Sequence, residues 1–239
     1  MLKYFNVEKH VSFDRMSILS VSGSAVKDVL KLFRLLFFIN VIMIFAAVLL
    51  YPGKFPVLTY PISDLGATRA LNGDANTPSM LILISGMVIS SILMFKAAFR
   101  LEKERARGPA RAMFFLTMLC GFGYILLTAP DDIMDTVHRW GGALTVGSLW
   151  AITIIMLEML RSSFGIRKFI IFHYVLHVTV IIYAICFFLD LYVRDMAQKA
   201  ALLALGTIWI LCVNGLSRSL RGEMEAQGEE LRMESTLPR

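Results

Sequence analysis

Six apolar runs, each about as long as a membrane is thick, constrain this chain more than any other feature. A transmembrane α-helix needs about 20 consecutive apolar residues, because it rises about 1.5 Å per residue through a hydrocarbon core about 30 Å thick. Of the 239 residues, 57% are hydrophobic and only 18% are charged, too few to cover the surface of a water-soluble domain. The runs lie at about residues 30–51, 79–99, 112–129, 140–160, 169–190 and 200–216.

The sequence therefore predicts an all-α fold, a polytopic six-transmembrane-helix bundle. Helices are favoured because lipid offers no partners for free backbone amide and carbonyl groups. We expect a cytoplasmic N-terminal segment at 1–29, a six-span membrane domain at 30–217 and a charged cytoplasmic tail at 218–239. A short amphipathic helix is the most structure expected in the tail. Gly121, Gly123, Gly141 and Gly142 are expected where two helices pack closely.

Basic residues predict the orientation, because Lys and Arg near the ends of spans stay on the cytoplasmic side. One side receives both termini and most of the basic residues. The other side receives only Lys54, Arg69, Arg139, Arg194 and Lys199. Both termini should therefore be cytoplasmic, and we expect a multi-pass membrane protein. This topology explains the net charge of +6, so the charge gives no reason to expect a nucleic-acid partner.

Two polar clusters are expected on the outer side. The first lies at residues 60–66, where a Pro, a Ser, an Asp and a Gly favour an ordered turn and Gly66 permits a positive φ. The second, at residues 131–139, follows the third run as a loop with three carboxylates and an imidazole. We expect the two to meet at the end of the bundle. The candidate ligand-binding residues are Ser63, Asp64, Asp131, Asp132, Asp135, His138 and Arg139.

Two interpretations of this outer cluster stay open. In the first it binds a ligand at headgroup depth, with Arg139 on a phosphate and the carboxylates on a cationic headgroup or a divalent ion. In the second it is a hydrogen-bonded lock, in which Asp64 caps a turn, Arg139 pairs with an aspartate and His138 ties the loops together.

A pair of histidines, His173 and His177, lies one helical turn apart in the fifth run. Imidazoles at i and i+4 can both reach one zinc ion, but two ligands do not complete a site. From the rise of a helix, Glu158 and Cys212 fall near the depth of His173, and Asn40 and Cys120 near the depth of His177. The alternative is hydrogen bonding within the bundle, to Asn40, Ser90, Ser91 or Tyr174.

The motif at residues 60–66, with an apolar run before it and a Pro-led run after it, resembles the prokaryotic family called domain of unknown function 998. That family is related to eukaryotic six-span proteins of the Frag/DRAM/Sfk type. The resemblance covers roughly the whole membrane region and implies a six-helix bundle with cytoplasmic termini in a prokaryotic inner membrane. It marks Ser63, Asp64, Gly66 and His138 as family-like positions without a catalytic role. The eukaryotic relatives are linked to membrane-lipid organisation and trafficking.

The paired histidines are also similar to the His-x-x-x-His span of membrane hydrolases of the adiponectin-receptor and ceramidase group. Those hydrolases have seven spans and further Ser, His and Asp ligands at comparable depth, whereas this chain offers no intramembrane Asp at that level. Zinc is accordingly the one cofactor that the resemblance suggests, and none is expected otherwise.

We therefore expect an integral membrane protein that binds or organises lipid, or a membrane partner, through the outer cluster without catalysis. The expected partners are membrane lipid and either another membrane protein or a second copy of the chain. One alternative is a zinc-dependent intramembrane lipid hydrolase centred on His173 and His177. Another is a transporter of small solutes or lipid, although the spans lack the paired Gly and Pro interruptions of broken helices.

Overall fold

The computed structural model describes residues 23–103 and 109–236, so most of the predicted N-terminal segment lies outside the described residues. In the described ranges the chain forms seven α-helices, one short 3-10 helix and no strand. The elements are α2 (Gly23–Leu50), η1 (Ile62–Gly66), α3 (Thr77–Lys103), α4 (Pro109–Leu126), α5 (Asp131–Met159), α6 (Arg161–Phe164), α7 (Ile166–Phe188) and α8 (Arg194–Thr236).

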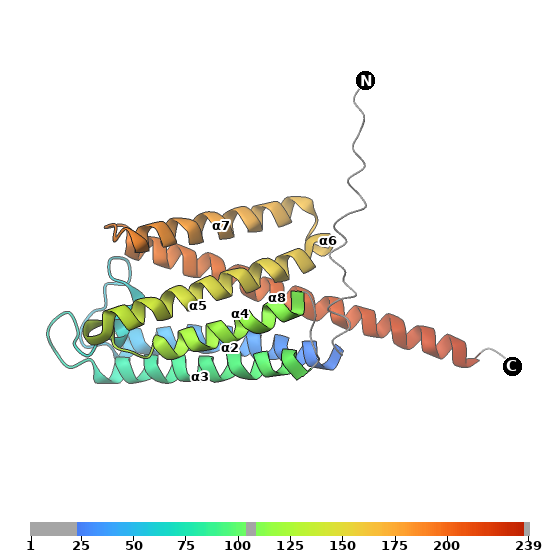
Figure 1. Cartoon of the computed structure of the whole chain (residues 1–239), viewed down its shortest axis with the longest axis horizontal. Coiled ribbons are helices and arrows are strands. Elements are labelled where there is room, and N and C mark those ends of the chain that lie inside the picture. The colour runs from blue at the N-terminus through green and yellow to red at the C-terminus, as the bar shows by residue number, and fades with distance from the viewer. Residues whose placement is uncertain (1–22, 104–108, 237–239) are drawn as a thin grey trace, which may run out of the picture.

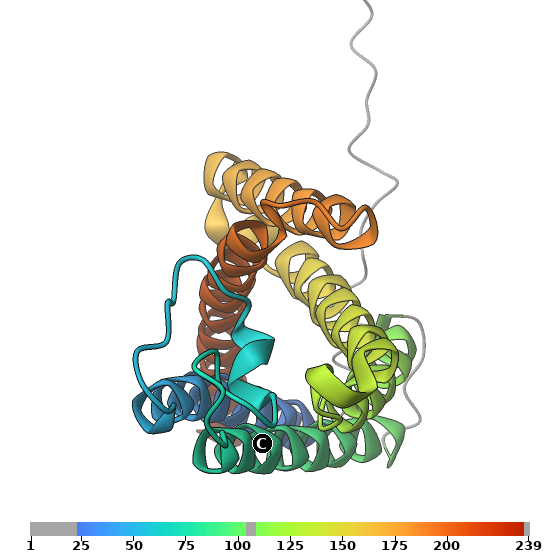
Figure 2. The same cartoon turned by 90° about the vertical axis from the view of Figure 1, so that its left-hand side faces the viewer.

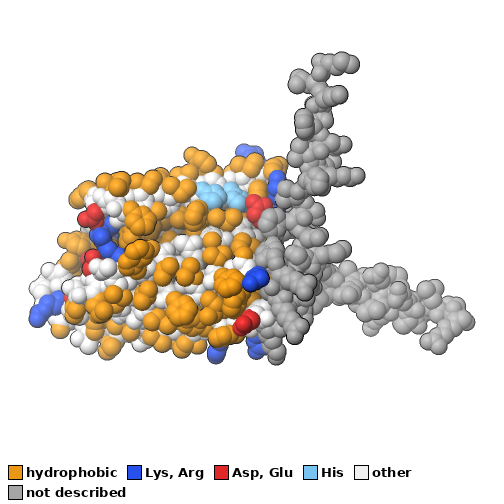
Figure 3. Space-filling view, viewed as in Figure 1, with side chains coloured by type: hydrophobic (Ala, Val, Ile, Leu, Met, Phe, Trp, Pro, Cys, Tyr) orange, Lys and Arg blue, Asp and Glu red, His pale blue; other side chains and the backbone are white. Residues whose placement is uncertain are grey.

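Five of these helices, α2, α3, α5, α7 and α8, are long and apolar enough to cross a membrane. Helix α4 is also apolar, but its stretch Ala110–Leu126 is shorter. Large apolar side chains such as Phe45 and Leu203 are 65% and 73% exposed, and Figure 3 shows hydrophobic side chains covering the face between the two ends. Such a surface suits lipid and not water. The chain is thus a multi-pass membrane protein.

The helices form a ring that α8 completes. Helix α2 packs on α3, α3 on α4 and α4 on α5, while α8 contacts both α5 and α2, and α7 packs mainly on α8 (Figures 1 and 2). Fully buried side chains fill the interior, among them Phe33, Met94 and Met156. The indole Nε1–H of Trp209 donates to the carbonyl of Phe33 over 3.1 Å, which fixes α8 against α2.

Close contact between α4 and α5 depends on two of the predicted glycines. A Cβ at Gly123 would lie 2.8 Å from the backbone nitrogen of Thr145, and one at Gly141 would lie 2.6 Å from that of Leu127. The prediction is confirmed at these positions and at Gly121, which meets the ring of Phe95. It is wrong at Gly142, where the nearest atom is 3.9 Å away, an ordinary contact.

Two assignments differ from the sequence-based expectation. Residues 131–139 are not a loop but the first turns of α5, because aspartates in a first turn are stabilised by the helix N-terminus and Pro130 precedes them. The polarity of the segment hid its helical structure. The tail is not a short separate helix either, because α8 continues without interruption to Thr236 and projects beyond the other helices (Figure 1).

Candidate functional site

A cavity of about 320 Å³ lies where the loop after α2 meets the start of α5. Four aspartates and one arginine are among its nine lining residues, so its walls are predominantly negative. The lining residues are Tyr51, Asp64, Ala67, Arg69, Ala70, Leu71, Asp131, Asp132 and Asp135. Figure 2 looks onto this end of the bundle, where the loop with η1 lies across the helices.

The wall formed by η1 is firmly anchored to α3. The Asn76 amide donates to the carbonyls of Leu65 (3.0 Å) and Ala67 (2.9 Å), and the Ser79 hydroxyl donates to Leu65 (2.9 Å). The Leu65 side chain is completely buried. Gly66 is needed for close approach and not for a positive φ, since a Cβ there would lie 2.8 Å from Leu83. Sequence reasoning missed this role of the buried Asn76.

The opposite wall is the first turn of α5, which touches η1 and the following loop through two aspartates. The Asp132 carboxylate accepts hydrogen bonds from the backbone nitrogen (2.9 Å) and the hydroxyl of Thr68. The Asp131 and Asp64 carboxyl groups also line this cavity and interact with each other. Two ionised carboxylates repel each other and have no hydrogen between them, so a proton on one of them favours this contact.

The electrostatic setting of Asp64 favours that proton. Burial is the main cause that raises the pKa of Asp64 from 3.8 to about 7, and the charges of Asp131 and Asp195 add to it. Arg194 acts in the opposite direction. The neutral form of Asp64 is therefore favoured far above the pH at which an ordinary aspartate ionises.

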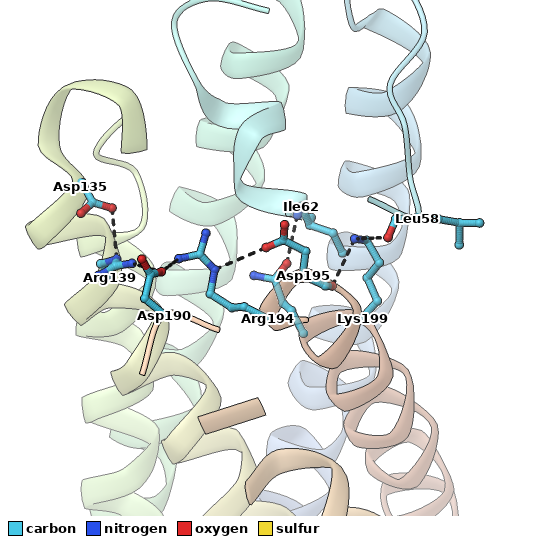
Figure 4. A network of polar contacts seen from close by, with 9 residues as sticks. Leu58, Ile62, Asp135, Arg139, Asp190, Arg194, Asp195 and Lys199 are labelled. Atoms are coloured by element: carbon cyan, nitrogen blue, oxygen red, sulfur yellow. Dashed lines mark hydrogen bonds and ion pairs between the residues drawn. The ribbon is translucent and has the colours of Figure 1, made fainter. Parts of the chain in front are cut away.

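A ladder of ion pairs continues from the cavity across the end of the bundle (Figure 4). Arg139 lies 3.3 Å from Asp135 and 3.2 Å from Asp190, and Arg194 pairs with both Asp190 and Asp195. The ladder joins α5, the α7–α8 connection and α8. The sequence-based prediction did not include Asp190, Arg194 and Asp195, because they lie at the end of the fifth run and beyond it. Their alternating charges were nevertheless visible in the sequence.

Helix α8 also holds the loop that contains η1. The Gln198 side chain accepts a hydrogen bond from the backbone nitrogen of Ile62 (3.0 Å), and the Lys199 ammonium donates to the carbonyl of Leu58 (3.3 Å). The loop is thus fixed between α3 and α8, whereas its contact with α5 runs through the two aspartates.

The predicted outer residues divide into four groups. Asp64, Asp131, Asp132 and Asp135 meet around the cavity. His138 is buried, and its Nδ1 lies 2.7 Å from the carbonyl of Ala129, where it secures the turn between α4 and α5. Arg139 belongs to the ladder, and Ser63 lies on η1 without lining the cavity. The arrangement thus combines a cavity with two of the predicted structural contacts, the pairing of Arg139 with aspartates and the hydrogen bond of His138 within a connection.

The histidine pair lies in the other half of the bundle, on α7 where it faces α5. His173 Nδ1 is 3.3 Å from His177 Nε2, and His173 Nε2 is 3.6 Å from Glu158 Oε1, as its depth predicted. His177 packs edge-on against Trp150.

The predicted further partners of the histidines are elsewhere. Asn40 bonds to Ser90 and Tyr124, and Ser91 donates to the carbonyl of Gly121, so these groups bond to partners other than the two histidines. Cys120 contacts the carbonyl of Thr145. Within residues 23–103 and 109–236, no three His, Cys, Asp or Glu side chains are grouped to hold a metal ion.

In comparisons with known proteins, the chain matches no family model, no curated protein and no solved structure. The resemblance to the domain of unknown function 998 family therefore stays a prediction.

Proposed function

We propose that the chain is a six-span protein of a prokaryotic inner membrane with cytoplasmic termini, and that it binds the ammonium group of a lipid headgroup in the cavity. No catalysis is part of this proposal. The feature on which it rests is the cavity wall, where four carboxylates face a single guanidinium at one end of the bundle.

The length and position of α4 support a sixth span. Its 18 residues rise about 27 Å, close to the thickness of a hydrocarbon core, and it packs between α3 and α5. Basic residues support the orientation, since they gather at the end opposite the cavity. Among those in the described helices are Lys27, Lys31, Arg100, Arg111, Arg161, Arg167 and Lys168. The cavity then faces outward at headgroup depth.

An ammonium group fits the chemistry of this wall. It offers three hydrogens to several carboxylate oxygens, and its charge offsets the surplus of negative charge. Arg69 donates one hydrogen bond to the carbonyl of Gly73 and keeps further donors for an anionic group. A zwitterionic headgroup with a primary amine and a phosphate, as in phosphatidylethanolamine, presents both charges at suitable depth.

The test is lipid retention by the full chain in detergent, read by native mass spectrometry. The chain is offered phosphatidylethanolamine, phosphatidylcholine, whose amine carries no hydrogen, and phosphatidylglycerol, which has no amine. We expect preferential retention of phosphatidylethanolamine, and its loss in the Asp131→Asn/Asp135→Asn variant. Asp74→Asn is the matched control, because Asp74 pairs with Asn72 in the same loop and does not line the cavity.

Equal retention of the three lipids would overturn the proposal. Competition by soluble phosphoethanolamine at low concentration would show that the headgroup alone is recognised and that the ligand need not be a lipid. Displacement of lipid by magnesium or calcium, reversed by a chelator, would identify a divalent ion as the ligand instead.

A second candidate, zinc-dependent lipid hydrolysis, is favoured by the histidine spacing. Two nitrogens bound to one tetrahedral zinc ion lie about 3.3–3.4 Å apart. His173 Nδ1 and His177 Nε2 are 3.3 Å apart, and Glu158 lies beside the other nitrogen of His173, where a carboxylate orients a metal-bound imidazole. Zinc content and its loss in His177→Ala test this candidate.

A further inference from the structure

The first turn of α5, residues 131–133, is separated from the rest of the helix. Met134 has non-helical backbone angles, φ −128° and ψ 46°. On the N-terminal side of this break, the backbone nitrogens of Ile133 and Met134 both bond to the carbonyl of Pro130, over 3.3 and 2.8 Å. A single residue that interrupts a helix in this way can act as a hinge.

This turn docks on a wall that is held in place without it. The wall is η1, with Leu65 buried, Asn76 and Ser79 bonded to its carbonyls, and α8 bonded to its first residue. The hinged turn is therefore the side of this contact that can move, whereas η1 is held in place.

Asp131 and Asp132 of the turn both meet the opposite wall, and the two contacts respond differently to pH. The Asp132 carboxylate accepts two hydrogen bonds from Thr68, and these bonds are strongest when the carboxylate is ionised. The Asp131 and Asp64 carboxyl groups line the same cavity, where a proton on one of them allows a hydrogen bond between them and two ionised groups repel each other. Protonation of one pair thus decides whether the docking contact is attractive or repulsive.

Charged groups from every neighbouring element surround this pair. Asp131 faces Asp64 from α5, while Asp195, Arg194 and Lys199 act on it from α8. Burial and the two aspartates raise the pKa of Asp64 to about 7, against the influence of Arg194. The other ionisable groups in the cavity wall are Arg69, Asp132 and Asp135.

We propose that residues 131–133 form a proton-dependent latch, which stays docked on η1 while Asp64 and Asp131 share a proton and swings away at Met134 when both are ionised. Opening the latch widens the entrance of the cavity. This device does not depend on which ligand the cavity binds.

The direction of the pH effect follows from the raised pKa. The docked state holds a proton that the free turn does not, so docking is favoured at low pH. It weakens as the pH rises from the ordinary Asp value of 3.8 toward about 7. The latch is therefore closed in mildly acidic medium and opens as the medium becomes alkaline.

The experiment measures the distance between two spin labels on the full chain in lipid nanodiscs without added ligand. One label replaces the exposed Ile133 on the latch and the other replaces the exposed Thr77, beside Asn76 on the fixed side. The three buried cysteines are replaced by alanine. Between about pH 5 and about pH 8.5 we expect a longer distance to change from the minor to the major component.

Two variants identify the group that titrates. Asp64→Asn and Asp131→Asn each replace one carboxyl by an amide that donates a hydrogen bond at every pH, so the short distance should persist throughout. Asp74→Asn, in the same loop but outside the cavity wall, should behave as the parent chain.

A distance that is independent of pH in the parent chain would overturn the proposal. A transition that persists in both Asp64→Asn and Asp131→Asn would overturn it too, because neither carboxyl group would then be the one that titrates. Hydrogen exchange of residues 131–134 in the chain with its native cysteines checks the same outcome. After correction for intrinsic rates, exchange should accelerate at alkaline pH in the parent chain and not in Asp64→Asn.

Discussion

The guanidinium of Arg139 lies 3.2 Å from the carboxylate of Asp190, which joins α5 to the connection between α7 and α8. Asp190 also pairs with Arg194, so one carboxylate receives two guanidinium groups. Its backbone is equally specialised, with φ 51° in the left-handed region directly after α7. Leu191 closes the helix end by donating to the carbonyl of Cys186 over 3.0 Å. Asp190 thus both ends α7 through its left-handed backbone conformation and forms ion pairs through its side chain.

Substitution of Asp190 separates these two contributions. Its side chain is 71% exposed, so the ion pairs contribute little, whereas a left-handed alanine costs about 1–2 kcal/mol. We expect Asp190→Ala to lower the unfolding temperature in detergent, and Asp190→Gly, which loses the same ion pairs, to lower it much less. If the two variants are equally destabilised, the ion pairs and not the backbone conformation control this connection.

Arg34 provides the second prediction, because it forms a polar contact between α2 and α8 within the bundle. Its guanidinium donates to Asn214 over 2.9 and 3.2 Å and to Ser217 over 3.2 Å. Arg34→Leu should cost about 1–2 kcal/mol, since Asn214 then lacks its partner in an apolar environment. In a double-mutant cycle, Asn214→Leu should recover part of this loss. Strictly additive effects, measured by unfolding in mixed detergent, would contradict the pairing.

Two neighbouring glycines give a matched pair for packing between α4 and α5. Gly141→Ala places a Cβ 2.6 Å from the backbone of Leu127, which cannot move without shifting α4, so we expect a loss of about 1–3 kcal/mol. Gly142→Ala meets nothing closer than 3.9 Å, and the better helix propensity of alanine should leave stability unchanged or slightly higher. Equal unfolding temperatures for the two variants would show that the helices separate easily.

Apolar length was the reliable signal in this sequence, because lipid fixes how long a helix must be and leaves no choice of secondary structure. Positions along the axis were predictable for the same reason, and Glu158 does lie beside His173. The direction in which each side chain points around its helix axis was not predictable, since a uniformly apolar helix surface does not reveal which face packs inward. Asn40, for example, was expected at the depth of His177, and its side chain bonds instead to Ser90 and Tyr124.

The cavity was predictable as a set of charges but not as a shape. The aspartates of two segments were expected together, and four of them are. The roles of Asn76 and Gly66 in fixing the cavity wall were not expected, because each acts through contacts with residues more than ten positions away in the sequence. Polar residues at a helix start also look like a loop, which concealed the first turns of α5.

The raised pKa of Asp64 predicts how stability depends on pH. A carboxyl group whose folded-state pKa is raised stabilises the fold fully below its ordinary pKa of 3.8, and this contribution is lost as the pH rises to about 7. The unfolding temperature should therefore fall between about pH 5 and about pH 8, and should fall less in Asp64→Asn. Asp74→Asn serves as the control. An unfolding temperature that falls equally in parent and Asp64→Asn would assign the pH dependence to other groups.

The donor set around His173 and His177 predicts the metal content. Zinc sites use four protein ligands when structural and usually three when catalytic, whereas this pair offers two imidazoles, with Glu158 beside the outer nitrogen of His173. We therefore expect well under one zinc ion per chain in protein purified without chelator and without an immobilised-metal step. Near-stoichiometric zinc that is lost in His177→Ala, but retained in Asp131→Asn, would instead make hydrolysis the leading function. Substrates would then be sought among lipid esters and amides.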